Sequence, residues 1–212
     1  MTEEEKIFAG TMFNPSKPEL RALKRVSHEL SAAYSRSTED ETELRQMLLR
    51  RILGGMGEHV FMQGPIFFHY GSHTTIGDYF FANYNFTVQD DGPVTIGDHV
   101  DIGPNVTIVT PIHPMVAEER VSLIDEEGNP ARLCYVRPVH IGSRVWLGAN
   151  VVVCGGANIG DGCVIGAGSV VTGDIPPNSF AAGVPCRVIR PITEKDSMRN
   201  QPDRLGGCRV PE

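Results

Sequence analysis

The sequence predicts a parallel β-helix, an all-β fold in which short strands coil around one axis. Three observations indicate it: a six-residue apolar repeat, an earlier imperfect copy of that repeat, and one long interruption between the two. A period of six fits neither an α-helix, which repeats every 3.6 residues, nor an open strand, which repeats every two. In the regular part the first place of each hexad is Ile141, Leu147, Val153, Ile159, Ile165 and Val171.

The residue after each of these first places is glycine in most hexads, which permits the chain to bend at a corner. We expect the first place to point inward, and each strand to pair with its equivalent about 4.8 Å along the axis. The fifth places are also small or β-branched and are expected to face the interior: Val145, Val151, Ala157, Cys163, Ser169 and Ile175. One coil cannot bury its own apolar side, so stability has to come from its neighbours.

The earlier copy of the repeat begins hexads at Ile76, Ile96 and Ile102 but contains faults. The spacing from Val88 to Ile96 exceeds one hexad, and the surplus falls at 90–93, where Asp-Asp-Gly-Pro predicts a turn. The spacing from Ile108 to Ile141 does not correspond to a whole number of hexads. We therefore expect residues 111–137 to leave the coil as an extended loop, a feature that usually has a function.

Residues 1–57 lack the repeat and predict an N-terminal helical cap over the open end of the β-helix. Residues 18–33 predict one helix, and a Thr38-x-x-Glu41 capping box predicts the start of a second. The apolar face expected for that second helix is Leu44, Met47, Leu48 and Ile52. The predicted organisation is a cap over 1–57, a β-helix over 58–190 with its excursion at 111–137, and a polar tail over 191–212.

The composition excludes some classes of protein. A net charge of −7 argues against nonspecific nucleic-acid binding, which needs a basic surface. The first residues show neither a secretory signal nor an apolar run of membrane-spanning length, so we expect a cytoplasmic protein. The five cysteines form no CxxC pair, which predicts reduced thiols rather than disulfides or a metal site.

His113 is the histidine that lies on the predicted excursion, between Pro111 and Pro114. A neutral imidazole suits general-base catalysis because its ordinary pKa lies near 6.5. The alternative is a loop histidine that bonds local carbonyl groups. Two other functions stay open at this point. Three histidines could bind the metal of a β-helical carbonic anhydrase, or the β-helix could serve as a non-catalytic interaction surface. The histidines for a metal would be His69, His99 and His140.

Several short strings are more specific than the repeat itself. They are EKIFAG at 5–10, FANYN at 81–85, IHP at 112–114, VWLG at 145–148, VIGAGSV at 164–170 and AGVPCR at 182–187. Together they closely resemble the maltose and galactoside O-acetyltransferases, a branch of the hexapeptide-repeat acyltransferases, over about residues 4–192. The resemblance implies a left-handed coil, a homotrimer, and acetyl-CoA bound in grooves between neighbouring coils without a metal. It also implies that the excursion crosses a subunit boundary to complete the site.

The resemblance also implies roles for individual residues. His113 would be the general base that takes the proton of an acceptor hydroxyl. Asn83 would contact both the acceptor and the acetyl end of acetyl-CoA, and Asp91 would accept hydrogen bonds from acceptor hydroxyls. Both also have a structural reading as turn residues. The positions implied to contact the cofactor are Trp146 on its pantetheine arm, Ala149, Ala167 and Thr172, and the arginines Arg187 and Arg190 near its nucleotide end.

This sequence departs from the family pattern at four positions. Asn14 stands where the family has an acidic acceptor residue, and His69 stands at another acceptor position, where the family has serine or aspartate. Phe81 replaces a tyrosine, and Gly173 replaces a cationic residue near the cofactor phosphate. The catalytic and cofactor positions therefore match better than the acceptor positions. The expected reaction is acetyl transfer to a hydroxyl of a sugar or sugar-like acceptor; the alternative is a non-sugar hydroxyl, of a xenobiotic or of serine.

Overall fold

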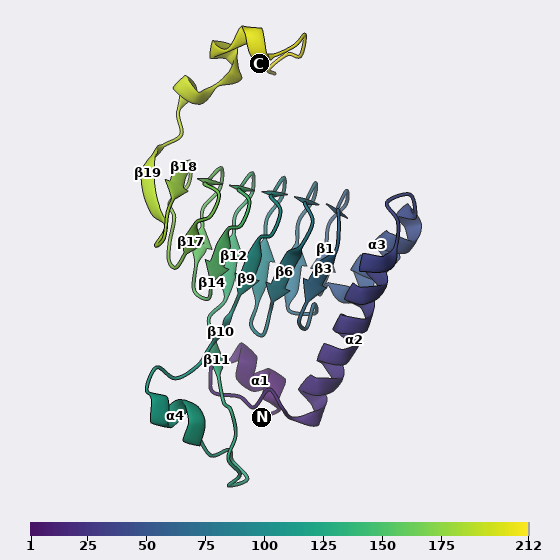
Figure 1. The fold of residues 1–212 in the computed structure, drawn as a ribbon, viewed down its shortest axis with the longest axis vertical. Coiled ribbons are helices and arrows are strands. Elements are labelled where there is room, and N and C mark those ends of the chain that lie inside the picture. The colour runs from purple at the N-terminus through teal and green to yellow at the C-terminus, as the bar shows by residue number, and fades with distance from the viewer. Residues whose placement is uncertain (212) are drawn as a thin grey trace.

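Each hexad of the sequence forms one short strand and one corner in the computed structural model of the protein, which describes residues 1–211. Three successive strands make one coil, and strands one coil apart pair in parallel. The result is a β-helix with three sheets, capped by helices at one end (Figure 1). The predicted fold class is therefore confirmed, while the left hand of the coil stays a prediction from the family resemblance.

The first sheet contains β1 (Gly55–Met56), β4 (Thr74–Ile76), β7 (Val94–Ile96), β12 (Val139–Ile141) and β15 (Asn158–Ile159). The second contains β2 (Phe61–Met62), β5 (Phe81–Ala82), β8 (Asp101–Ile102), β13 (Trp146–Leu147), β16 (Val164–Ile165), β18 (Ser179–Ala182) and the antiparallel β19 (Arg187–Pro191). The third contains β3 (Ile66–Phe68), β6 (Phe86–Gln89), β9 (Thr107–Val109), β14 (Val152–Cys154) and β17 (Val170–Val171).

The interior of the β-helix is filled by the residues that the hexad pattern predicts. All six first-place residues from Ile141 to Val171 are buried, and so are all six fifth-place residues from Val145 to Ile175. The glycine in second place is required by the close stacking of coils. A Cβ on Gly148 would lie 2.7 Å from the backbone nitrogen of Ala167 in the next coil. Any larger side chain would push the two coils apart.

The three kinds of corner are named here after one residue in each. The His99 corner comprises 57–60, 77–80, 97–100, 142–145 and 160–163. The Asn83 corner comprises 63–65, 83–85, 103–106, 148–151 and 166–169. The His69 corner comprises 69–73, 90–93, 110–138, 155–157 and 172–174.

The early and late coils differ in length at the His69 corner. Phe81 pairs with Asp101, whereas Trp146 pairs with Val164, so a coil early in the chain is longer than one of the late coils, which consist of three hexads each. The surplus predicted near Asp91 lies at the His69 corner. The long excursion leaves the coil at that same corner, one coil later. All irregularities of the early coils are thus stacked on one edge of the β-helix.

The excursion is a folded appendage that contacts the N-terminal segment (Figure 1). Its two arms form an antiparallel ribbon of β10 (Pro111–Ile112) and β11 (Tyr135–Val136), with the short helix α4 (Ala117–Ser122) between them. Cys134 forms a backbone bridge with Phe13, and Lys17 pairs with the carboxylates of Asp125 and Glu127 at 3.5 and 2.6 Å. The N-terminal segment therefore helps to fix the position of the excursion.

The helical cap consists of α1 (Glu3–Phe8), α2 (Pro18–Arg36) and α3 (Thr42–Ile52). A capping box at Thr2 and Glu5 starts α1. The prediction that Thr38 caps the second long helix was wrong. Thr38 and Glu41 bond each other in a turn, and α3 begins after Glu41.

The predicted apolar face of α3 was half wrong. Leu48 and Ile52 are buried, but Leu44 and Met47 are 38% and 48% exposed. Arg45 is buried instead, because its guanidinium donates to the carbonyl oxygens of Met62 and Gln63 at 2.5 and 2.9 Å. These two bonds satisfy carbonyl groups at the edge of the first coil, and Arg45 rather than Leu44 or Met47 lies on the buried face of the helix.

Both ends of the β-helix differ slightly from the expected boundaries. β1 pairs with β4, so the coil starts at Gly55, inside the segment expected to belong to the cap. After β19 the tail makes three 3₁₀ turns, at Glu194–Asp196, Met198–Asn200 and Pro202–Arg204. Glu212, the last residue of the predicted tail, lies outside the described residues. No helix within 1–211 is long and apolar enough to cross a membrane.

Candidate functional site

His113 lies at the base of the excursion, directly after β10, in a pocket of about 220 Å³ that Arg120, Val121 and Arg132 also line. Its Nδ1 is 3.3 Å from the carbonyl oxygen of Leu133 on the returning arm. A carbonyl oxygen can only accept, so this contact places the imidazole proton on Nδ1. Nε2 is then the nitrogen with the free lone pair, which is the form that a general base requires. The contact with a local carbonyl group that the loop-histidine alternative predicted is present, and it orients the ring.

A groove of about 460 Å³ brings Asn83, Trp146 and Ala149 together on the second sheet. The register explains this, because Phe81 pairs with Asp101 and Asp101 pairs with Trp146, so the three outward side chains are stacked in consecutive coils. The Trp146 side chain is 55% exposed, which is unusual for a large aromatic residue and leaves its ring free for a ligand.

The side chain of Asn83 is oriented by its own turn. Its Oδ1 accepts from the backbone N–H of Tyr84 at 2.9 Å, so the group that remains for a ligand is the Nδ2 donor. Ala167 lies one coil further along the same corner, where the N–H of Gly168 donates to the carbonyl of Ala149 at 2.8 Å. The predicted cofactor positions at this corner thus follow one line along the β-helix.

A second group of predicted cofactor residues lies near the C-terminal end of the coil. Thr172, Gly173 and Arg187 line a pocket of about 570 Å³ with Asp174 and Val188 among its other residues. Arg190 is not among the residues that line this pocket, and it pairs with the C-terminal tail. Its guanidinium makes a bidentate pair with Asp196 in the tail, at 2.8 and 2.7 Å.

The adjacent aspartates at the His69 corner have different roles. Asp90 accepts from the backbone N–H of Tyr70 and from the hydroxyl of Thr74, both at 2.8 Å, and so performs the structural work of the turn. Asp91 is 3% exposed, and its Oδ2 has no hydrogen-bond partner among the described residues. A buried carboxylate oxygen without a partner is costly for folding, which makes Asp91 a candidate binding residue.

His69 lies beside Asp91, with its Nε2 3.8 Å from Asp91 Oδ1. Burial, followed by the nearby Lys24, His28 and His73, lowers the pKa of His69 to about 4. Burial also raises the pKa of Asp91 to about 6, opposed in part by the Gln89 side chain. At neutral pH the pair is therefore a neutral imidazole facing a carboxylate rather than an ion pair.

The remaining predicted acceptor residue, Asn14, lies away from this pair. It is buried, with its Nδ2 3.4 Å from Asp125 of the excursion and its Oδ1 accepting from the N–H of Ser16 at 3.0 Å. These contacts join the N-terminal segment to the excursion. Its role toward an acceptor stays a prediction.

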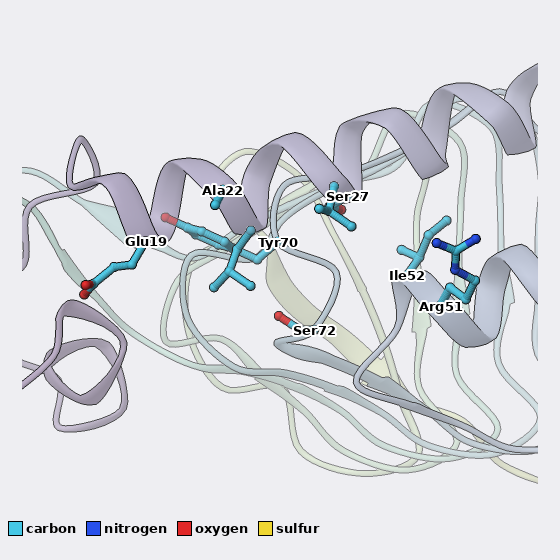
Figure 2. Close-up of a pocket in the computed structure, with 9 residues that line it drawn as sticks. Glu19, Ala22, Ser27, Arg51, Ile52, Tyr70 and Ser72 are labelled. Atoms are coloured by element: carbon cyan, nitrogen blue, oxygen red, sulfur yellow. The ribbon is translucent and has the colours of Figure 1, made fainter.

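A further pocket of about 270 Å³ lies between α2 and the end of α3 (Figure 2). Figure 2 shows the Tyr70 ring extending beneath α2, with Glu19 at one end of the pocket and Arg51 and Ile52 at the other. Tyr70 is buried, and its hydroxyl has no hydrogen-bond partner among residues 1–211. Burial, together with the charge of Asp91, raises the pKa of Tyr70 well above its ordinary value.

Sequence reasoning missed three residues that the structure brings to these places. Arg120 and Arg132 line the His113 pocket, and the Nε2 of His28 lies 3.4 Å from the Nδ1 of His69. The two arginines lie on the predicted excursion, so their place near His113 could have been predicted from the sequence. The contact of His28 could not be predicted from the sequence, because its neighbour His69 is distant in the chain.

The three histidines of the metal-enzyme alternative do not come together. His69 and His99 lie at different corners. His140 lies at neither corner but within β12 of the first sheet. Within the part of the chain that the structure describes, no group of three His, Cys, Asp or Glu residues is arranged to hold a metal ion.

Comparisons with known proteins agree with this architecture. Residues 138–173 match the family described as bacterial transferase hexapeptide (six repeats), and residues 6–57 match the maltose acetyltransferase hexapeptide capping motif. The galactoside O-acetyltransferase of Escherichia coli (strain K12) is 42% identical over 196 residues, 92% of each chain.

Two solved structures share both fold and sequence with this chain. A galactoside acetyltransferase in complex with coenzyme A has a TM-score of 0.84 and 42% identity, covering 92% of this chain and 94% of that one. A maltose O-acetyltransferase from Clostridium difficile 630 has a TM-score of 0.80 and 39% identity, covering 92% and 99%.

Proposed function

The chain belongs to the maltose and galactoside O-acetyltransferase family of hexapeptide-repeat proteins, and from this premise we propose that it acetylates a sugar or sugar-like acceptor. In the proposed reaction an acceptor hydroxyl oxygen attacks the thioester carbonyl of acetyl-CoA, with His113 as the general base. The observation that carries the proposal is the contact between His113 Nδ1 and the Leu133 carbonyl, which leaves Nε2 unprotonated.

The proton balance of this reaction needs one imidazole. Nε2 of His113 takes the proton of the acceptor hydroxyl as the new C–O bond forms. When the C–S bond breaks, the sulfur of coenzyme A takes that proton from the imidazolium, and His113 returns to its starting form. The products are an O-acetyl ester and the free thiol of coenzyme A.

The groove along the Asn83 corner fits the acetyl donor. It is lined by the exposed indole of Trp146 and by Gly148 and Ala149, which suits the extended pantetheine arm. Thr172, Gly173 and Arg187 lie further along the β-helix, where Arg187 supplies a cation for a phosphate. The related galactoside acetyltransferase was solved with coenzyme A bound, which supports the same use of this surface.

The acceptor is proposed to bind at the His69 corner, where Asp91 offers an unpartnered carboxylate oxygen. A carboxylate can accept from two hydroxyls of one sugar ring, and burial strengthens each bond. The names of the relatives, galactoside and maltose O-acetyltransferase, support a sugar acceptor. A non-sugar hydroxyl is the alternative that a substrate panel would reveal.

Within one chain the proposed site is divided. His113 and Asn83 line different pockets that share no residue. The excursion beside His113 also exposes Met115, Val121 and Ile124, of which Met115 is 90% exposed. We therefore propose a homotrimer in which the excursion of one subunit brings His113 to the acetyl-CoA groove of its neighbour, a head-to-tail arrangement that closes into a ring.

Mixed trimers test both the base and the division of the site. His113→Ala and Asn83→Ala are each expected to be nearly inactive alone in a thiol-release assay with acetyl-CoA and a panel of sugars. In trimers refolded from an equal mixture, one interface in four pairs an intact His113 with an intact Asn83. About a quarter of the wild-type rate should return if a closed ring shares its sites.

The controls separate the possible failures. Each variant refolded alone must stay inactive, and refolded wild type must recover its rate. No recovery in the mixture would place both residues in one subunit and refute the shared site. Wild-type protein without thiol release on any hydroxyl acceptor would refute the proposed function itself.

A further inference from the structure

His28 lies on α2, outside every set of predicted site residues, yet it contacts the proposed acceptor corner. Its Nε2 is 3.4 Å from Nδ1 of His69, and the two ring centroids are 5.4 Å apart. The neighbouring residues hold this contact in place, because the Ser27 hydroxyl donates to the carbonyl of Phe68 at 2.9 Å. The same turn of α2 is thereby clamped to the strand that ends just before His69.

The proton positions in this group follow from what each atom can do. His69 is neutral near pH 7, so it carries one N–H. With that proton on Nε2, His69 directs a donor at the Asp91 carboxylate and a lone pair at His28. The other tautomer would direct the Nε2 lone pair at a carboxylate, which is repulsive. With its own proton on Nε2, His28 donates to the unprotonated Nδ1 of His69 and so favours the same tautomer.

The Asp91 carboxylate and the His28 N–H favour the same tautomer of His69, and the described residues supply no further hydrogen-bond partner for the His69 ring. Lys24 on α2 and His73 at the same corner act on His69 through charge, and both disfavour its protonated form. Phe67 contacts the ring of His28 from the strand side, with centroids 4.8 Å apart, and offers no hydrogen-bonding group. His28 is thus the side chain whose hydrogen bond adds to the effect of Asp91 on the tautomer.

Asp91 is the last residue in this series of contacts, which runs from His28 through His69. Its Oδ1 faces His69, while its buried Oδ2 has no partner within residues 1–211. At 3.8 Å the His69 N–H is too far from Oδ1 for a hydrogen bond, but its dipole attracts Oδ1 and favours one orientation of the carboxylate, which sets the direction of Oδ2. Such orientation of a binding group by a residue behind it is a common way in which sites gain precision.

We propose that His28 is a positioning residue for the acceptor: its Nε2–H bonds His69 Nδ1, keeps the His69 Nε2–H directed toward Asp91 Oδ1, and leaves Asp91 Oδ2 to accept an acceptor hydroxyl. This inference rests on the proposed function, because it assigns the acceptor to this corner. It adds a residue from the helical cap to a site that is otherwise built on the β-helix.

The tautomer itself can be measured without any substrate. Two-bond ¹⁵N–¹H NMR of the imidazole rings at pH 7.5 reports which nitrogen of His69 is protonated, with His69→Gln to assign its signals. Wild type should show protonated Nε2 and unprotonated Nδ1. In His28→Leu the Nδ1 lone pair loses its donor, and the His69 signals should shift toward a mixture of tautomers. In His28→Gln, which retains a side-chain N–H donor, the wild-type pattern should largely return.

Kinetics provide the second readout. For an acceptor that wild type acetylates, His28→Leu should raise the acceptor KM about fivefold, roughly the factor of one net hydrogen bond, with the acetyl-CoA KM unchanged. His28→Gln should recover most of this loss. Glu29→Leu is the matched control, because Glu29 is the exposed next residue on α2. It should keep the wild-type KM.

Each outcome supports or overturns the inference. An unchanged His69 tautomer in His28→Leu overturns it, whether or not the acceptor is known. Equal losses in His28→Leu, His28→Gln and Glu29→Leu, or a parallel rise in the acetyl-CoA KM, would show that α2 has only a structural role. If wild type acetylates no acceptor, the proposed function fails, and the NMR result alone decides whether His28 positions His69.

Discussion

The late coils and the His69 corner of the early coils are built from the same repeat but solve different problems. From Val139 to Val171 the coils consist of three regular hexads each and fill their interior with small and branched apolar side chains. At the His69 corner the early coils are longer, and the lengthened corner brings His69, Asp90 and Asp91 into its turns, with both aspartates buried. The comparison teaches that a regular coil provides a packed apolar interior, while a lengthened corner provides places for polar and titratable side chains.

The excursion extends the same principle. It leaves the β-helix at the corner where the previous coils were already lengthened, and it contacts the N-terminal segment. The groove is lined by residues of both the early and the late coils, whereas His69 and Asp91 lie at the early corner and His113 lies on the excursion. Three experiments sharpen or break this division.

The largest effect is expected from His113→Ala. Loss of a general base typically lowers the rate by about 10²–10⁴-fold. Because His113 is exposed, its removal should leave the midpoint of thermal unfolding unchanged. Steady-state thiol release and a thermal melt measure the two quantities. A near-wild-type rate would show that the excursion takes no part in catalysis.

The next effect is on stability and belongs to the late coils. Leu147→Ala should lower the free energy of unfolding by about 2–5 kcal/mol, since Leu147 is fully buried and its loss leaves a cavity. Its strand neighbour Trp146 faces outward, so Trp146→Ala should cost about 1 kcal/mol or less. Denaturant unfolding of both variants makes the comparison. Equal losses would show that the outward face carries as much packing as the interior.

The smallest effect concerns the pH dependence of the His69 corner. The raised pKa of Asp91, about 6, means that the folded carboxyl keeps a proton that the unfolded chain has lost above pH 4. Stability from this group falls as pH rises from about 4 to 6. The lowered pKa of His69, about 4, has the opposite sign, because between pH 4 and 6.5 the unfolded chain binds the extra proton. Stability from His69 rises with pH, and the two slopes oppose each other.

Single variants should separate these slopes. Relative to wild type, Asp91→Asn should become more stable as pH rises from 4.5 to 6, and His69→Gln should become less stable. Each change should be roughly 1 kcal/mol per pH unit or less once solvent screening is included. Urea unfolding at several pH values measures it. Stability curves parallel to that of wild type would show that neither group is perturbed by the corner.

The sequence predicted the repeat, the turn at 90–93 and the limits of the excursion, because these are local patterns. It failed where a distant contact decided the outcome. Arg45 is buried although the helical pattern placed Leu44 and Met47 inside, because two carbonyl groups at the end of the first coil need its guanidinium. The Thr38 capping box likewise forms a turn, and α3 starts after Glu41.

For the site, the sequence supplied the residue types and the tertiary structure supplied their grouping. A hexad determines by itself which side chains face inward, and the spacing of Ile141, Leu147 and Val153 was sufficient for that. Which outward residues meet depends on the number of residues in each coil and on how the excursion folds back. Asn83 meets Trp146, and His28 meets His69, only because coil stacking and the packing of α2 bring together chain segments that no local pattern relates.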